Sequence, residues 1–66
     1  MLVSVNGRQQ EIEPEATVAD LVAGFNLQPK FVAVEVNREL VPRRSFDATR
    51  LAEGDQIEIV TLVGGG

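Results

Sequence analysis

The sequence predicts a small α+β fold in which a mixed sheet of four to five strands is covered on one face by one main helix. Three observations lead to this prediction. Short segments near both ends and in the middle alternate apolar and polar residues, as half-buried strands do. One segment, residues 17–25, carries apolar residues at helical spacing. Turn-forming residues separate these segments, and 66 residues are enough for one domain only.

The N-terminal segment predicts a β-hairpin. Val3 and Val5 alternate with polar neighbours, and Asn6-Gly7 follows them. Both turn residues tolerate the positive φ that a type I′ turn requires, which makes this pair a strong hairpin signal. A second strand is expected over residues 8–13, with Ile12 as its apolar anchor.

The next segment predicts the helix. Thr17 can cap its first turn, and Asp20, three residues later, completes a capping box with Asp in place of Glu. Asn26 can take the left-handed position after the last turn, with Leu27 packing back on the helix. The expected apolar stripe consists of Val18, Leu21, Val22 and Phe25.

The second half of the chain predicts three more segments. A third strand is expected over residues 31–36, and a short return strand over residues 40–41 after a turn that begins at Asn37. Residues 43–51 have no clear period. They are expected to form a short helical turn and a loop, with Phe46 directed inward.

The last strand is expected over residues 56–62, with Ile57 and Ile59 facing the core. The chain is expected to leave the sheet from Thr61 onwards. A hairpin followed by a helix can leave the last strand beside the first, which is the β-grasp arrangement, a fold that hosts many unrelated functions. The expected core comprises Val3, Val5, Ile12, Val18, Leu21, Val22, Phe25, Val32, Val34, Leu51, Ile57 and Ile59.

The composition argues against several functions. Cysteine and histidine are absent, so the chain has no thiol nucleophile, no imidazole base and none of the usual zinc ligand sets. We therefore expect no enzyme, no metal site and no bound cofactor. A net charge of −4 disfavours nucleic acid, which requires a basic face. No apolar run reaches the roughly 20 residues of a membrane span, and no signal peptide is visible. A cytoplasmic protein is expected.

The sequence ends in Val63-Gly64-Gly65-Gly66, directly after the last expected strand. We therefore expect a β-grasp domain over residues 1–62 and a flexible C-terminal glycine tail over residues 63–66. Glycine has no Cβ, so this tail could enter a channel that is too narrow for side chains. Extended, it would span about 13 Å at roughly 3.3 Å per residue. Frayed termini are common in proteins, but a tail on a domain without reactive side chains is the candidate site.

Four segments together resemble the ThiS family of bacterial thiamine biosynthesis, over essentially the whole chain. They are Val32-Ala33-Val34-Glu35-Val36-Asn37, Leu40-Val41-Pro42-Arg43, Leu51-Ala52-Glu53-Gly54-Asp55-Gln56-Ile57-Glu58-Ile59-Val60 and Val63-Gly64-Gly65-Gly66. The terminal Gly65-Gly66 is shared with ubiquitin and with the small subunit of molybdopterin synthase, so the resemblance implies a ubiquitin-like β-grasp. One departure is Phe46, where many relatives have tryptophan.

The resemblance implies a sulfur-carrier cycle. An E1-like, ThiF-type enzyme would adenylate the Gly66 carboxylate, using ATP and magnesium that the carrier itself does not bind. Sulfur from a cysteine desulfurase or another persulfide donor would then displace AMP and leave a C-terminal thiocarboxylate. A ThiG-type thiazole synthase would receive that sulfur. Gly64, Gly65 and Gly66 would be the residues by which the partners recognise the tail.

Val60, Leu62 and Val63 are expected to form an apolar docking patch for these partners beside the tail. Arg43-Arg44 is expected to be a solvated pair, and Asp55 a turn residue rather than a metal ligand. Two alternatives stay open. The chain could carry sulfur for another pathway, such as molybdopterin, tRNA thiolation or an amino acid. It could also be a non-catalytic β-grasp interaction module with an inert tail.

Overall fold

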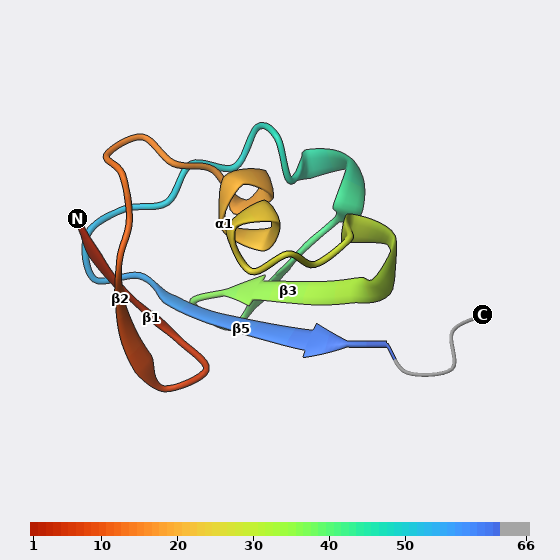
Figure 1. Ribbon diagram of the computed structural model, residues 1–66, viewed down its shortest axis with the longest axis horizontal. Helices are drawn as coiled ribbons and strands as arrows, with labels where there is room; N and C mark the ends of the chain where they lie inside the picture. Colours follow the sequence, from red (N-terminus) through yellow and green to blue (C-terminus); the bar gives the residue numbers. More distant parts are fainter. Residues whose placement is uncertain (63–66) are drawn as a thin grey trace.

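The computed structural model of the protein describes residues 1–62. Its elements are β1 (Leu2–Val5), β2 (Arg8–Glu11), α1 (Val18–Gly24), the 3₁₀ turn η1 (Pro29–Phe31), β3 (Val32–Val36), β4 (Glu39–Val41), the 3₁₀ turn η2 (Arg43–Ser45) and β5 (Gln56–Thr61). The strands form one five-stranded sheet in the order β2-β1-β5-β3-β4 (Figure 1). The first and last strands pair in parallel and all other pairs are antiparallel. The predicted β-grasp arrangement is confirmed.

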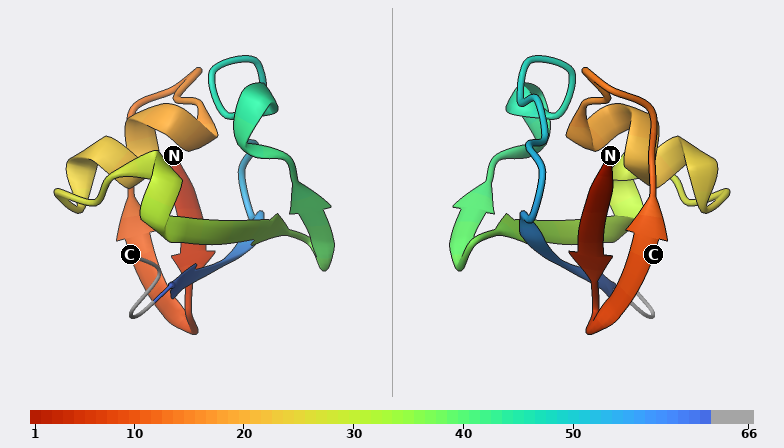
Figure 2. Two further views of the ribbon diagram at one scale, coloured as in Figure 1. Left: turned by 90° about the vertical axis from the view of Figure 1, so that its right-hand side faces the viewer. Right: turned by 90° about the vertical axis from the view of Figure 1, so that its left-hand side faces the viewer.

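The core lies between the sheet and α1. The helix and the segment between β4 and β5 lie on the same side of the sheet (Figure 2). Within residues 1–62, no element covers the opposite side, which we call the open face. The buried apolar side chains are Val3, Val5, Ala16, Val18, Leu21, Val22, Val32, Val34, Phe46, Leu51, Ile57 and Ile59. Alternation along each strand therefore separates a buried face from the open face.

The N-terminal hairpin has the predicted turn. Asn6 and Gly7 have φ values of 52° and 85°, the signs that a type I′ turn requires. β2 ends at Glu11, two residues earlier than expected, but the pairing continues beyond it. The N–H of Ile12 donates to the carbonyl of Met1 at 2.8 Å, and the N-terminal ammonium donates to the carbonyl of Ile12 at 3.0 Å.

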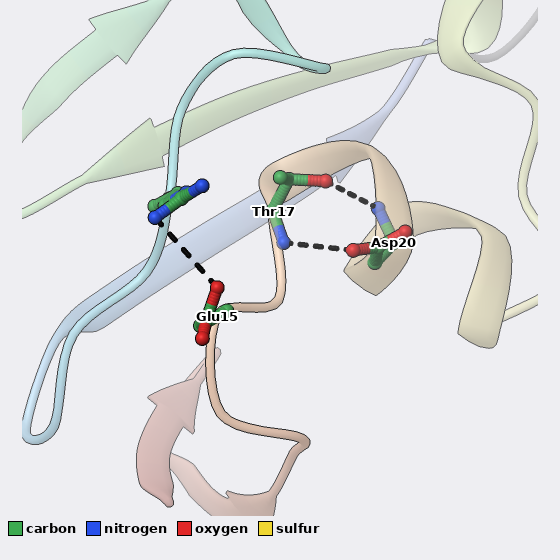
Figure 3. A network of polar contacts seen from close by, with 4 residues as sticks. Glu15, Thr17 and Asp20 are labelled. Atoms are coloured by element: carbon green, nitrogen blue, oxygen red, sulfur yellow. Dashed lines mark hydrogen bonds and ion pairs between the residues drawn. The ribbon is translucent and has the colours of Figure 1, made fainter.

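The helix is held at both ends as the sequence predicts. The Asp20 N–H donates to the Thr17 hydroxyl at 3.1 Å, and the Thr17 N–H donates to the Asp20 carboxylate at 3.0 Å, which completes the capping box (Figure 3). At the other end Asn26 has a φ of 60°, and the N–H groups of Asn26 and Leu27 bond back to the last turn in a Schellman motif. A Glu15–Arg50 ion pair of 3.8 Å lies nearby on the exposed surface.

Two expected core residues are less buried than predicted. Phe25 is 40% exposed, because the helix ends at Gly24 and Phe25 serves as its C-cap at the margin of the sheet. Ile12 is half-buried and packs against the edge of the core, since β2 ends before it. Ala16, which was not expected in the core, is buried just before the helix, where its carbonyl accepts a hydrogen bond from Leu51.

Candidate functional site

β5 carries the chain from the core to the last described residue, and its two faces differ. Ile57 and Ile59 are 1% and 8% exposed, as predicted. Val60 and Leu62 are 59% and 44% exposed, so they point away from the face of Ile57 and Ile59, as expected. The expectation that the chain leaves the sheet from Thr61 is wrong. Thr61 still pairs with Val32, since the pairing of β3 with β5 extends to the first residue of β3.

An apolar patch lies on the open face beside the end of β5. Val60 on β5 is directly opposite Ala33 on β3. Two residues further along β3, Glu35 is directly opposite Leu40 on β4. Leu40 is 67% exposed, the highest value among the large apolar side chains of residues 1–62. We call Ala33, Leu40, Val60 and Leu62 the open-face patch. Leu40 and Ala33 were not among the expected docking residues, although the register of a two-residue turn at Asn37-Arg38 places both on this face.

Two acidic side chains lie side by side on this face. Glu35 and Glu58 are direct cross-strand partners on β3 and β5. Like charges in such positions destabilise a sheet. Within residues 1–62, neither carboxylate has a basic group at ion-pair distance, and the single ion pair is Glu15–Arg50. An uncompensated acidic pair beside an apolar patch is suited to a partner surface that combines apolar and basic side chains.

Two asparagine side chains hold the two ends of β5. Asn37 accepts a hydrogen bond from the Gln56 N–H at 3.0 Å and donates to Asp55 at 3.0 Å, at the start of the strand. Asn6 accepts from the Ile59 N–H at 2.8 Å and donates to the Ile59 carbonyl at 3.1 Å, towards its end. Both asparagines lie in turns with a φ of 52°. The turns at both asparagines were predicted from the sequence, but the hydrogen bonds of their side chains to β5 were not.

A backbone carbonyl at the end of η1 holds the chain immediately after β5. The Leu62 N–H donates to the carbonyl of Phe31 at 2.7 Å. Arg43 supports this turn, because its guanidinium donates to the carbonyls of Pro29 at 3.1 Å and Lys30 at 3.2 Å. Arg43 and Arg44 are both exposed, as expected of a solvated pair, but Arg43 also has this structural role, which was not expected. Its contacts bridge segments far apart in sequence, which composition and spacing do not reveal.

Asp55 has the turn role that was expected. Its carboxylate accepts a hydrogen bond from the Ala52 N–H at 2.7 Å and another from the Asn37 amide. Within residues 1–62, no group of three or more His, Cys, Asp or Glu side chains is arranged to hold a metal ion. No helix in this part of the chain is long and apolar enough to cross a membrane.

A hollow of about 320 Å³ lies between β2 and α1, on the helix side of the sheet. Ile12, Leu21 and Phe25 are among its apolar lining residues, and Gln10, Glu11, Glu13 and Asp20 are its polar lining residues. The lining contains no hydroxyl, thiol, amine or imidazole group. The expected tail residues Val63, Gly64, Gly65 and Gly66 lie outside the described residues.

Comparison with known proteins identifies the family. The model of the ThiS family matches residues 3–66. The chain belongs to the ThiS family. It is 35% identical to the sulfur carrier protein ThiS of Bacillus subtilis, over 98% of this chain and the whole of that protein. The crystal structure of a thiamine biosynthesis protein, ThiS, from Geobacter metallireducens superposes with a TM-score of 0.84 at 33% identity, with all of both chains covered.

A second group of relatives is longer. A thiazole synthase of Magnetococcus marinus is 39% identical over the whole of this chain, which spans 20% of that protein's length. A thiazole synthase of Paramagnetospirillum magneticum is similar at 35% identity, with the same coverage. A ThiS-like segment is thus part of these longer proteins. The present chain thus spans about a fifth of the length of these thiazole synthases and matches the ThiS family over residues 3–66.

Proposed function

We propose that this protein carries sulfur for thiazole formation in thiamine biosynthesis, and that the carboxylate of Gly66 is the group that is modified. The observation that carries the proposal is the family match, which extends through the terminal glycines to residue 66. The described site is compatible with it. β5 leads directly towards the terminus, and the open-face patch lies beside the end of that strand.

The proposed chemistry needs no reactive side chain on the carrier. A C-terminal carboxylate is ionised near neutral pH and is a poor electrophile. Attack by a Gly66 oxygen on the α-phosphate of ATP forms an acyl-adenylate and releases pyrophosphate. A persulfide sulfur then forms a bond to the Gly66 carbonyl carbon as AMP departs. Reductive cleavage of the sulfur–sulfur bond by a thiol leaves the C-terminal thiocarboxylate and a disulfide.

The proposed partners follow from these steps. An E1-like, ThiF-type enzyme would supply the ATP and magnesium site, and a cysteine desulfurase or another persulfide donor would supply sulfur. A ThiG-type thiazole synthase would accept it, which is supported by the occurrence of ThiS-like segments within thiazole synthases. Because adenylation consumes ATP, we propose that the carrier works in the cytoplasm.

The open-face patch is the proposed docking surface for these partners. Its apolar residues would be desolvated on binding, and the Glu35–Glu58 pair would face basic side chains of the partner. This surface extends the expected patch of Val60, Leu62 and Val63 across the sheet to Leu40.

The decisive experiment changes the length and the width of the tail. Three variants are needed: deletion of Gly66, addition of one alanine after Gly66, and Gly65→Val. Positioning errors of about 1 Å can cost about 10²-fold in rate. We therefore expect all three variants to lose most ATP-dependent thiocarboxylate formation, measured as a sulfur-for-oxygen mass gain on the intact protein with the adenylating enzyme, a desulfurase, cysteine and a thiol reductant.

Thermal unfolding provides the control, because none of the three changes alters residues 1–62. The variants should unfold at the temperature of the unchanged protein. If the alanine-extended protein, confirmed as unprocessed, gains sulfur as fast as the unchanged protein, the Gly66 carboxylate is not a uniquely positioned acceptor. The carrier mechanism would then be wrong.

A further inference from the structure

The side-chain amide of Asn6 takes the place of a peptide group in the sheet. β1 and β5 run in parallel, and the last backbone bond described between them joins the Asn6 N–H to the Ile57 carbonyl at 2.9 Å. The backbone of β1 then turns away through the Asn6-Gly7 turn. The Asn6 side chain continues the ladder, because its oxygen accepts from the Ile59 N–H and its nitrogen donates to the Ile59 carbonyl.

These two bonds satisfy both backbone groups of a buried residue. Ile59 is in the core, and both contacts of Asn6 are partly shielded from water. Hydrogen bonds of this kind contribute modestly to stability, but they fix geometry where a strand loses its neighbour. On the opposite edge of β5, the Leu62–Phe31 bond holds the chain. The exit of the chain from the sheet is thus held from both sides.

We infer that Asn6 is a positioning residue for the terminal carboxylate, an inference that rests on the proposed function. A partner that docks on the open face receives the tail from the end of β5, so the path of the tail depends on where Ile59 and the residues after it lie. Asn6 would act through this strand without touching the reacting atoms. Loss of its amide should lower the rate of the bound carrier and leave the affinity of docking unchanged.

Asn37 is a matched control at the other end of the same strand. It occupies a turn with the same φ of 52°, and its side chain also accepts a hydrogen bond from β5, at Gln56. Replacing either asparagine with glycine keeps a residue that tolerates positive φ and removes a side chain that holds β5. The two changes differ mainly in which end of β5 they release.

The experiment compares Asn6→Gly, Asn37→Gly and the unchanged protein. Thiocarboxylation is measured by intact mass over a range of carrier concentrations, at a temperature where all three are folded. We expect Asn6→Gly to lower the maximal rate at least about fivefold with the half-saturating concentration within about twofold. Asn37→Gly should stay within about twofold in both. If Asn6→Gly does not fold, Asn6→Asp, which keeps an acceptor and removes the donor, is measured instead.

Amide hydrogen exchange tests the structural premise without any partner. The Ile59 amide should exchange faster in Asn6→Gly than in Asn37→Gly, since only the first loses its acceptor. Equal maximal rates for the two variants, an effect confined to the half-saturating concentration, or unchanged Ile59 exchange would each overturn the inference. If the unchanged protein gains no sulfur at all, the proposed function is wrong. That result differs from failure of the Asn6 inference, which requires an active unchanged protein whose variants do not differ as expected.

Discussion

The two faces of β5 differ sharply in burial. Ile57 and Ile59 face the helix and are buried, whereas Val60 and Leu62 are apolar yet exposed. Burial of large aliphatic side chains stabilises a domain of this size, which has no disulfide to assist it. Exposed aliphatic side chains at the end of the same strand contribute little to folding. The alternation of a single strand thus separates side chains that stabilise the fold from exposed apolar side chains, which we propose bind a partner.

The open face also has a feature that the buried face lacks. Its apolar residues adjoin the Glu35–Glu58 pair, and like charges directly opposite each other tend to destabilise a sheet. The buried face contains no buried polar or charged side chain within residues 1–62. Under the proposed function, the favourable contacts of this surface would form with a partner. Substitutions on either face can therefore test whether the two faces have separate roles.

The largest expected effect is on the buried face. Ile57→Ala should lower the free energy of unfolding by about 2–5 kcal/mol, through lost burial and the cavity left behind. For so small a domain this change can unfold the protein at room temperature. A urea titration measures the effect, and Val60→Ala on the same strand is the control, expected to change stability by no more than about 0.5 kcal/mol. Similar losses for both variants would remove the distinction between the faces.

A smaller free-energy change is expected on the open face, in binding rather than folding. Val60→Asp and Leu40→Asp should each weaken binding to the adenylating enzyme at least about tenfold, or 1.4 kcal/mol, because an apolar contact would have to desolvate a charge. Titration calorimetry measures the affinity. The proposed docking surface is wrong if both variants bind as the unchanged protein does.

Leu2→Asp is the matched control for these two variants. Leu2 is exposed on the open face, but it lies at the start of β1, next to Gly54 and therefore near the start of β5. Binding should stay within about twofold, since the proposed contact is at the other end of the strand. Equal losses for Leu2→Asp and Val60→Asp would indicate a nonspecific effect of added negative charge on an already acidic protein.

Local sequence signals predicted most of the fold, and tertiary contacts account for what was missed. Turn chemistry at Asn6-Gly7, the capping box at Thr17 and the alternation of β5 are local, so the sequence sufficed. Leu40 was missed because its exposure depends on cross-strand register. The hydrogen bonds of Asn6 and Arg43 join segments distant in the sequence, and no single-sequence pattern specifies such partners.

Arg43 provides the smallest and most specific test of how the end of β5 is held. Arg43→Met keeps the aliphatic stem and removes the donors to the carbonyls of Pro29 and Lys30. Because these bonds are exposed, we expect a loss of about 0.5–1 kcal/mol in a urea titration, the lower part of the range for hydrogen bonds. Arg44→Met is the matched control, since Arg44 makes no hydrogen bond or ion pair among the polar contacts of residues 1–62.

The location of the effect matters more than its size. Releasing η1 should loosen the Phe31 carbonyl, so the Leu62 amide should exchange faster in Arg43→Met while the Ile59 amide, held by Asn6, stays protected. Asn6→Gly should give the opposite pattern. If Arg43→Met accelerates exchange at Ile59 and Leu62 equally, the end of β5 opens as one unit. The two edges of the strand would then not be held independently, and the separate roles assigned to Asn6 and Arg43 would be wrong.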